Sequence, residues 1–426
     1  MSMPLSLRGY RLATWAGTPV AGLLLNLRLR RGKEDGRRLG ERRGEARRER
    51  PHGPLVWLHG ASVGESLSLL PLIERLTQSG LSAMVTTGTV TSAELMARRL
   101  PAGAFHQFAP LDAPSFTRKF FAHWRPDLGL LAESELWPNM IIDAERAGVP
   151  LAMVNARMSE RSYARWLKAP GFIKALLGRF DQSLAQSEGD AQRLAGLGAR
   201  SVQVIGNLKY DAPAPPADRQ ELAALSGLVS GRPIWIAAST HDGEERVAAL
   251  AHRRLAERYP HVLTLIAPRH PERGADIAEE LRAAGFRVAL RSRGERPGPG
   301  IEIYLCDTMG ELGLFYRLAG VVFVGKSLGA EGGQNPIEPA KLASAILHGP
   351  GVANFREVYA LLDAAGGALE VVDAEDLAAR LASLFADPGR LRAMARAAAI
   401  AVERQSGAAD RALAALAPRL AALGRA

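Results

Sequence analysis

A regular alternation of short apolar runs with longer amphipathic stretches constrains the fold more than any other feature of this sequence. Five β-rich runs stand at Leu55–Leu58, Ala83–Thr87, Leu128–Leu131, Leu151–Val154 and Val202–Ile205. Stretches with helical periodicity separate them, as at Ser66–Gln78 and Thr91–Leu100. Because parallel strands need long crossovers, which are usually helices, this alternation predicts parallel βαβ units.

The alternation stops once and then restarts, which predicts two domains. Asp211–Asp218 reads DAPAPPAD, and three prolines in eight residues are typical of an extended linker. Five further runs follow at Ile234–Ala238, Val262–Ala267, Val288–Leu290, Val321–Val324 and Ala345–Leu347. A chain of 426 residues also exceeds what one ordinary hydrophobic core holds.

We therefore predict an α/β protein with two Rossmann-like domains that face a cleft. The N-terminal domain is assigned to residues 51–211, the linker to residues 212–218 and the second domain to residues 219–426. An arm at residues 1–50 offers no strand, so both domains are expected to fold without residues 1–30. Ligands of such sheets bind beyond the carboxyl ends of the strands.

The arm carries most of the net charge. The chain has a net charge of +10, and residues 1–50, with 13 Lys/Arg and 5 Asp/Glu, contribute +8 of it. A groove for nucleic acid would need basic residues spread over a folded face, so this distribution disfavours nucleic acid as a partner. A terminal basic cluster beside an apolar segment favours an anionic membrane surface instead.

The apolar segment of the arm runs from Leu12 to Leu27 and contains 16 uncharged residues. Roughly 20 are needed to span a bilayer as a helix. A cleaved signal peptide is disfavoured because arginines follow, rather than a small-residue cleavage site. A short spanning anchor and an interfacial anchor both stay open, and the length favours the interfacial one. In either case the arginine cluster would keep the domains on the cytoplasmic side of the membrane.

The motifs that the sequence lacks also limit its chemistry. The single cysteine, Cys306, cannot form a disulfide within the chain and argues against a cysteine-based zinc site. The sequence has no D-x-D triplet, no Walker-type G-x-x-x-x-G-K-[ST] and no G-x-S-x-G elbow. Phosphate binding would therefore use helix N-termini, arginine and lysine, and no metal or other cofactor is expected.

Polar residues follow the predicted strands of the first domain. Glu65 ends the stretch HGASVGE, where it either complements a helix dipole or acts as a general base. Glu133 begins the stretch ESELWPN, and a structural salt bridge is the alternative to a catalytic role because buried carboxylates need partners. Lys209, after the last strand, either neutralises a phosphate or carboxylate or is an ordinary surface lysine.

In the second domain, the polar segments after the strands are Ser239–Glu245, Pro268–Arg273, Asp307–Leu312, Gly325–Ser327 and Glu331–Pro339. The last segment is the most informative. Its glycines before Asn335 allow backbone amides at a helix N-terminus to face an anion, and Glu338 could hold ribose hydroxyls. Each segment alone is also compatible with an ordinary helix cap.

Together these motifs resemble those of the bacterial Kdo (3-deoxy-D-manno-octulosonic acid) transferases. The resemblance covers nearly the whole chain, from the N-terminal apolar segment and the RLGER stretch at Arg38–Arg42 onward. The matching motifs are Ala61–Glu65, Glu133–Asn139, Asn155–Arg157, Asn207–Asp211, Ser239–Glu245, Pro268–Arg273, Asp307–Leu312 and Gly332–Glu338. Eight motifs in the same order are too specific to match by chance.

The resemblance implies a GT-B fold and an inverting glycosyltransferase that moves Kdo from CMP-Kdo to a lipid A precursor, lipid IVA, in lipopolysaccharide biosynthesis. By position it implies Glu65 as the general base, and Glu133 and Lys209 as residues that stabilise the transition state. The residues that it implies for the CMP moiety are Pro268, Arg269, Met309, Gly310, Glu311, Asn335, Pro336, Ile337 and Glu338. Two positions depart from the family pattern: Gln334 stands where His is common, and Lys326 where Gly is common.

Two other functions remain compatible with the sequence. One is a GT-B transferase that uses a UDP-sugar on a lipid acceptor, which a comparison of CMP and UDP binding would separate. The other is a non-catalytic adaptor at the membrane surface with a decayed GT-B fold. An adaptor would have no need to keep four residues together that this chain has: Glu65, Glu133, Lys209 and Glu338.

Overall fold

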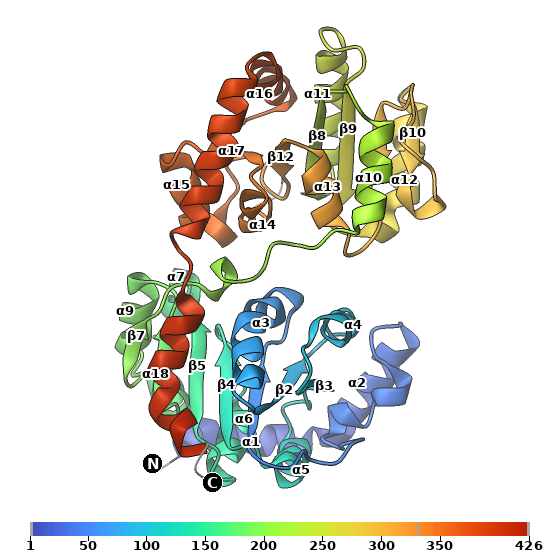
Figure 1. Ribbon diagram of the computed structural model, residues 1–426. Helices are drawn as coiled ribbons and strands as arrows, with labels where there is room; N and C mark the ends of the chain where they lie inside the picture. Colours follow the sequence, from blue (N-terminus) through green and yellow to red (C-terminus); the bar gives the residue numbers. More distant parts are fainter. Residues whose placement is uncertain (1–2, 330–331, 424–426) are drawn as a thin grey trace. The chain divides into compact units, whose positions relative to one another are not determined.

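The computed structural model describes residues 3–329 and 332–423, which form two compact units. Unit 1 contains the chain up to Ala212 and again from Ser406, and unit 2 contains Pro213–Gln405. Each unit is built around one parallel sheet with helices packed against it (Figure 1). The prediction of two domains with parallel sheets is confirmed.

Unit 1 has a seven-stranded sheet with the order β3-β2-β1-β4-β5-β6-β7. Its strands are β1 (Leu55–His59), β2 (Ser82–Thr87), β3 (Ala104–Phe108), β4 (Leu128–Ala132), β5 (Leu151–Ala156), β6 (Gln182–Ala185) and β7 (Val202–Val204). Its helices are α1 (Leu5–Ala16), α2 (Thr18–Arg30), α3 (Val63–Gln78), α4 (Val90–Arg99), α5 (Pro114–Trp124), α6 (Pro138–Arg146), α7 (Glu160–Trp166), α8 (Pro170–Leu177), α9 (Glu188–Gly196) and α18 (Ala408–Leu423), with short 3-10 helices η1 (Gly36–Arg38), η2 (Glu41–Arg43) and η3 (Leu208–Tyr210). The strand order reverses between β1 and β4, and ligands of such sheets bind beside the loops that follow strands at this point.

Unit 2 has a seven-stranded sheet with the order β10-β11-β9-β8-β12-β13-β14. Its strands are β8 (Ile234–Thr240), β9 (Leu263–Pro268), β10 (Val288–Leu290), β11 (Ile303–Leu305), β12 (Val321–Val324), β13 (Ala345–His348) and β14 (Ala368–Glu370). Its helices are α10 (Arg219–Leu228), α11 (Glu244–Ala256), α12 (Gly274–Ala283), α13 (Leu312–Leu318), α14 (Ile337–Lys341), α15 (Arg356–Ala364), α16 (Ala374–Ala386) and α17 (Pro388–Glu403), with 3-10 helices η4 (Pro271–Arg273), η5 (Arg291–Arg293) and η6 (Ala353–Phe355). Here the strand order reverses between β8 and β12.

Four strands were not predicted, and each has a weak sequence signal. β3 reads AFHQF, with two polar residues inside it, and β6 reads QSLA. β11 and β14 contain three residues each. Runs this short or this polar lack the period-2 pattern of a half-buried strand, so pairing with a neighbouring strand decides that they form.

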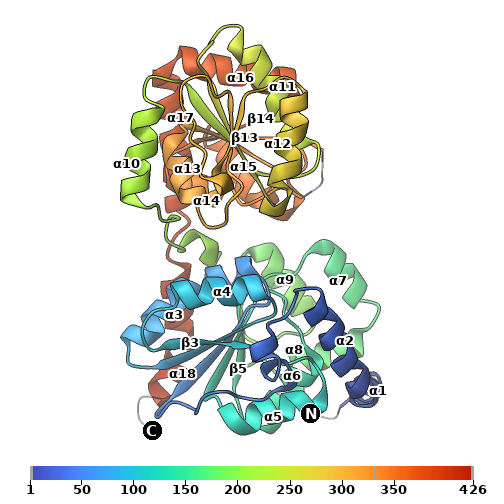
Figure 2. The same cartoon turned by 90° about the vertical axis from the view of Figure 1, so that its right-hand side faces the viewer.

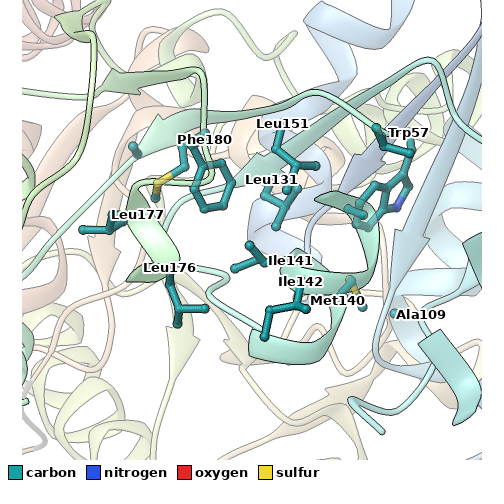
Figure 3. Close-up of a cluster of buried hydrophobic side chains, with 14 of the residues drawn as sticks. Trp57, Ala109, Leu131, Met140, Ile141, Ile142, Leu151, Leu176, Leu177 and Phe180 are labelled. Carbon is teal, nitrogen blue, oxygen red and sulfur yellow. The ribbon is translucent and has the colours of Figure 1, made fainter. Parts of the chain in front are cut away.

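Apolar side chains fill the space between the sheet of unit 1 and the helices on one of its faces (Figure 3). Trp57, Leu131 and Leu151 come from the neighbouring strands β1, β4 and β5, and Ile141 comes from α6. Each is at most 1% exposed. Burial of one such side chain is worth about 1.5–3 kcal/mol, so this layer holds α6 firmly against the sheet. The loop between β4 and α6, which carries Glu133, is fixed at both ends as a result.

The arm is not a separate segment but packs into unit 1. Leu7 of α1 is fully buried in the core, and Arg11 forms an ion pair at 2.5 Å with Asp143 of α6, which is also buried. Tyr10 Oη donates a hydrogen bond to Asp112 Oδ2 at 2.9 Å. The expectation that unit 1 folds without residues 1–30 is therefore not supported, because their removal would take Leu7 out of the core and would leave the buried Asp143 without the nearer of its two arginines.

The RLGER stretch covers the edge strand of the sheet. Arg38 donates to the carbonyl oxygen of His106 at 3.1 Å, and Glu41 Oε2 accepts from the backbone N–H of Phe108 at 2.7 Å. The same Glu41 carboxylate pairs with Arg38 at 2.7 Å. These contacts satisfy backbone groups of β3 that would otherwise form an open edge, and open edges invite aggregation.

The C-terminal helix α18 belongs to unit 1, whereas the sequence pattern predicts it to be part of the second domain. Its Ala408, Ala412 and Leu416 are fully buried in a core cluster that also contains residues of α3 (Figure 1). Asp211 accepts hydrogen bonds from the backbone N–H groups of Gly407 and Ala409, both at 2.5 Å. The predicted boundary of the second domain at residue 426 is therefore wrong; the unit ends at Gln405.

The apolar segment Leu12–Leu27 is divided between α1 and α2, which are 12 and 13 residues long and meet at Gly17. Among the residues that the structure describes, no helix is both long enough and apolar enough to cross a membrane. Figure 2 shows both helices on the outer side of unit 1. Their exposed large apolar side chains are Leu5, Leu12, Trp15, Val20, Leu23, Leu24 and Leu27, half of all such exposed side chains in the described residues.

Candidate active site

Glu65 lies in the first turn of α3, directly after β1, at the point where the strand order of unit 1 reverses. Its side chain belongs to a capping box: Ser62 Oγ accepts from the Glu65 N–H at 3.3 Å, and Glu65 Oε2 accepts from the Ser62 N–H at 3.3 Å. Glu65 Oε2 also accepts from the Ala61 N–H at 2.7 Å. Glu65 therefore does cap the helix N-terminus, and these hydrogen bonds fix its carboxyl group beside the loop.

The charge state of Glu65 departs from that of an ordinary cap. Burial raises the pKa of Glu65, and the carboxylates of Glu135 and Glu133 raise it further, against the lowering effect of the Ser62 hydrogen bonds. A helix cap on its own would favour the ionised form and lower the pKa. A carboxyl group with a raised pKa holds a proton more strongly, which suits a general base.

Glu133 and Lys209 form an ion pair at the same edge of the sheet. Lys209 Nζ, from η3, donates to Glu133 Oε1 at 2.7 Å, and both side chains are largely buried. Glu133 adopts a left-handed conformation with φ 51°. Asn155, fully buried near the end of β5, accepts from the Leu208 N–H at 2.8 Å and so holds the turn that carries Lys209. The salt-bridge interpretation of Glu133 is confirmed, with Lys209 as its partner.

Glu135, two residues further on, is a carboxylate that the sequence analysis did not single out. Its Oε2 accepts from Trp137 Nε1 at 2.5 Å and lies 3.6 Å from Nε2 of the buried His59. Burial alone would raise the pKa of Glu135, but His59 and Trp137 outweigh it and leave the pKa below its usual value. Glu135 is therefore ionised beside Glu65. Glu135 could have been noticed in the sequence as the second acid of ESELWPN. Its contact with His59 could not, because His59 is distant in the chain.

In unit 2, the loops after β8 and β12 are joined by one buried carboxylate. Glu244 accepts backbone hydrogen bonds from Lys326 at 2.7 Å, from Ser327 at 2.9 Å and from Leu328 at 3.1 Å. It also accepts from the N–H of His241 at 2.8 Å. These amides after β12 could have held an anionic ligand, but Glu244 already occupies them.

Basic side chains and imidazoles gather at the carboxyl edge of β8, β9 and β12. The rings of His241 and His270 meet edge to face with centroids 6.0 Å apart. Arg269, the residue before His270 in the loop after β9, is exposed. Burial lowers the pKa of His241, and the positive charges of Lys326, His270 and Arg269 lower it further, against the opposite effect of Glu244. A phosphate placed here would meet positive charge and imidazole donors.

The chain matches known proteins over most of its length. It is 38% identical over 387 residues to the 3-deoxy-D-manno-octulosonic acid transferase of Bordetella pertussis, which covers 88% of this chain and 89% of that one. The chain belongs to the Kdo transferase family. A second relative, the same transferase of Rickettsia bellii, is 32% identical and covers 91% of this chain and 92% of its own. The family model described as 3-Deoxy-D-manno-octulosonic-acid transferase (kdotransferase) matches residues 37–212 of this Kdo transferase.

Solved structures agree with the predicted GT-B fold of the Kdo transferase. A glycosyltransferase from Rickettsia africae ESF-5 has a TM-score of 0.58 and 12% identity, and covers 87% of this chain and 99% of its own. At that identity the likeness concerns the fold alone. Two parallel α/β units of this kind, with the family membership, make the chain a glycosyltransferase that transfers Kdo.

The residues implied for the CMP moiety lie at or after the ends of three strands of unit 2. Pro268 is the last residue of β9 and Arg269 follows it, whereas Met309, Gly310 and Glu311 follow β11. Asn335, Pro336, Ile337 and Glu338 lie at the start of α14, after β12. Because the sheet order runs β11-β9-β8-β12, these segments lie at the carboxyl ends of three strands, β11, β9 and β12, with β8 between β9 and β12.

Several of these residues also have structural partners. Glu311 is held by Arg291 at 2.7 Å, whereas Met309 is 55% exposed. Asn335 Oδ1 accepts from the Ile337 N–H at 3.0 Å, as expected of a residue that caps a helix. Asn335 Nδ2 lies 3.4 Å from Glu338 Oε1. Among the residues described, no group of three or more His, Cys, Asp or Glu side chains is arranged to hold a metal ion.

The two departures from the family pattern lie in the same loops. Lys326 has φ 58°, a left-handed conformation that favours glycine. This conformation explains why Gly is common at this position in the family. Gln334 Nε2 lies 3.0 Å from His241 Nε2, and its carbonyl oxygen accepts from Tyr359 Oη at 2.9 Å. Both residues therefore border the imidazole and arginine cluster.

Proposed function

We propose that this Kdo transferase moves Kdo from CMP-Kdo, with inversion at the anomeric carbon, to a hydroxyl group of a lipid A precursor such as lipid IVA. The observation that carries the proposal is Glu65, whose raised pKa and fixed position after β1 suit a general base. A base is required because the acceptor hydroxyl must lose its proton as it attacks.

In the proposed reaction, the acceptor oxygen bonds to the anomeric carbon while the bond from that carbon to the phosphate oxygen breaks. Glu65 receives the hydroxyl proton, and CMP leaves with the electron pair of the broken bond. The phosphate gains negative charge in the transition state, and preorganised positive charge lowers the barrier. Arg269 and Lys326 would supply that charge, and His241 would gain a proton as the phosphate offsets its cationic neighbours.

We assign Glu133 and Lys209 to stabilisation of the transition state. Kdo carries its own carboxylate, so an ammonium group at the reaction edge would balance donor charge. Glu133 holds Lys209 Nζ in place at 2.7 Å, which limits the cost of orienting a flexible side chain. The donor's CMP moiety is assigned to the segments at Pro268–Arg269, Met309–Glu311 and Asn335–Glu338.

The proposal requires no metal ion or other cofactor. Arginine, lysine and imidazole donors supply the positive charge that a divalent cation provides in other sugar-nucleotide enzymes. Transfer is therefore expected to continue in excess EDTA when CMP-Kdo is supplied ready-made. A strict requirement for Mg²⁺ at the transfer step would contradict this part of the proposal.

We place the enzyme at the cytoplasmic face of the inner membrane, bound at the interface rather than through the bilayer. The exposed apolar side chains of α1 and α2 support this assignment, because half of the large exposed apolar side chains of the described residues lie on these two helices, and such concentrations mark interaction sites. A lipid acceptor would also be more concentrated for an enzyme held at the membrane surface.

The test is mass spectrometry of lipid products after incubation with CMP-Kdo and a tetraacylated lipid A precursor. Wild-type protein should add Kdo, and Glu65→Gln should lower turnover by about 10² or more while CMP affinity stays unchanged. Glu74→Gln, on the same helix, is the matched control and should behave as wild type. Near-normal turnover in Glu65→Gln would exclude it as the base, and binding of UDP in preference to CMP would point to a UDP-sugar donor.

A further inference from the structure

An open groove of about 650 Å³ lies on unit 1 beside α1. This arginine groove is lined by Met3, Arg8, Arg11, Leu12, Trp15, Pro114, Arg118 and Arg146. The groove combines the first helix of the arm with α5 and α6, both of which α1 contacts. None of these residues belongs to the candidate active site.

The arginine groove has an excess of positive charge. In the described part of the chain, Asp143 is the one carboxylate that pairs with its arginines, at 2.5 Å to Arg11 and 3.7 Å to Arg146. Asp143 is 2% exposed and faces the protein interior. Arg8, Arg118 and Arg146 are exposed, so three guanidinium groups face solvent without a carboxylate of their own to neutralise them fully.

Apolar side chains continue from the groove along the arm. Leu12 and Trp15 line the groove and are still 64% and 57% exposed. Beyond them, α2 presents Leu23 and Leu24 at 60% and 53% exposure. Tryptophan and arginine side by side at the border of an apolar surface are typical of protein that lies at a lipid–water interface.

We propose that the arginine groove binds the phosphate of an anionic membrane phospholipid, while the adjoining apolar side chains of α1 and α2 enter the outer part of the bilayer. Guanidinium groups match phosphate because each donates two parallel hydrogen bonds. A soluble anion would explain the arginines but not the apolar side chains beside them. The inference rests on the proposed membrane-surface location but not on the proposed donor or acceptor.

The variant that tests the groove replaces the three exposed arginines and leaves Arg11, which supports Asp143, unchanged. Arg8→Gln/Arg118→Gln/Arg146→Gln is compared with Arg392→Gln/Arg396→Gln/Arg404→Gln, three exposed arginines around α17 that lie outside the groove. Both variants lose the same charge. Circular dichroism and thermal unfolding first establish that each variant keeps the fold.

Cosedimentation is measured with phosphatidylcholine vesicles that contain or lack phosphatidylglycerol. Each basic residue near an anionic surface contributes about fivefold to binding, so the groove variant should bind phosphatidylglycerol vesicles roughly 100-fold more weakly. The control variant should remain within about twofold of wild type. Equal losses in the two variants would overturn the proposal, because net charge alone would then explain binding.

A lysine variant separates a phosphate site from diffuse attraction. Arg8→Lys/Arg118→Lys/Arg146→Lys keeps the charge but loses the paired donors. Its affinity for phosphatidylglycerol vesicles should therefore lie between that of the wild type and that of the glutamine variant. Wild-type binding by the lysine variant would overturn the headgroup site. Binding that appears only when a lipid A precursor is added to the vesicles would also overturn it and assign the groove to the acceptor.

Turnover in detergent micelles separates this inference from the proposed function. The groove variant should transfer Kdo to a micellar lipid A precursor at the wild-type rate, because no bilayer is present. Glu65→Gln should bind phosphatidylglycerol vesicles as wild type does and fail in transfer. Loss of micellar turnover in the folded groove variant would contradict a role limited to the membrane surface.

Discussion

Glu65 and Glu135 are both carboxyl side chains at the same edge of the sheet of unit 1. Their surroundings shift their pKa values in opposite directions. Burial and two neighbouring carboxylates raise the pKa of Glu65, whereas His59 and Trp137 lower that of Glu135 despite its burial. Pairs of this kind separate a proton acceptor from a residue that stays charged. At the residue scale, the site therefore depends on Glu135 as well as on the base itself.

Glu135→Gln should shift the pH dependence of transfer. Removing the Glu135 charge removes one cause of the raised pKa of Glu65, so the base stays deprotonated to a lower pH. The acid limb of the kcat/KM profile is then expected to move to lower pH. Glu135→Asp keeps the charge and should leave the limb closer to its wild-type position. A shift of the limb to higher pH in Glu135→Gln would contradict this account.

Lys326→Gly should stabilise unit 2 and weaken CMP binding. A left-handed conformation costs a non-glycine residue about 1–2 kcal/mol, and glycine loses about 0.5–1 kcal/mol in conformational entropy, so a net gain of roughly 0.5–1 kcal/mol is expected. Ala343→Gly is the matched control, because Ala343 has φ 52° and follows α14, outside the segments assigned to the donor. Both variants should raise the thermal midpoint, but only Lys326→Gly should lower CMP affinity in calorimetry. Unchanged CMP affinity would remove Lys326 from the proposed phosphate site.

At the scale of single elements, the 3-10 helices η1 and η2 act as a cover for the edge of the first sheet. Glu41 is 3% exposed and serves both Arg38 and the backbone of β3. Glu45, a few residues further on, pairs with Lys119 at 3.4 Å on the surface. The same kind of ion pair should therefore have very different effects on stability at these two positions.

Glu41→Gln should destabilise unit 1 by about 2–3 kcal/mol, since it leaves buried donors without a charged partner. Glu45→Gln should cost less than about 1 kcal/mol, which is typical of an exposed ion pair. Tryptophan fluorescence in urea is a suitable measurement, because five of the six tryptophans lie in unit 1. If the two variants unfold at the same urea concentration, β3 does not depend on this cover.

At the scale of the whole chain, unit 1 is completed by residues that are synthesised after unit 2. Leu416 and the alanines of α18 fill the core beside α3, and Asp211 caps the start of that helix. The chain thus leaves unit 1 once and returns to it once. A fragment that ends at Gln405 contains every strand of unit 1 but lacks part of its core.

Removal of residues 406–426 should therefore destabilise unit 1 and leave unit 2 intact. Hydrogen exchange is expected to lose protection in β1–β5 while β8–β13 keep theirs, because the missing contacts all lie in unit 1. The milder change Leu416→Ala should cost about 2–5 kcal/mol, as for other buried leucines. Leu228→Ala, at a position that is 43% exposed, is the control and should cost far less. Loss of protection in unit 2 on truncation would show that α18 supports both units.

The sequence by itself determined the two parallel sheets, the place of most strands, the family and the segments of the candidate site. These features follow from local patterns: strand and helix periodicity, proline and glycine at turns, and motifs of a few consecutive residues. Only the tertiary structure decided that α18 completes unit 1, that the arm packs through Leu7 and Arg11, and that β3, too polar to be predicted, pairs as an edge strand. It also decided that Glu244 occupies the backbone amides after β12 and that Glu65 and Glu135 differ in pKa. Each of these outcomes depends on distances between residues that are far apart in the chain, and burial and electrostatic interactions act through those distances rather than along the sequence.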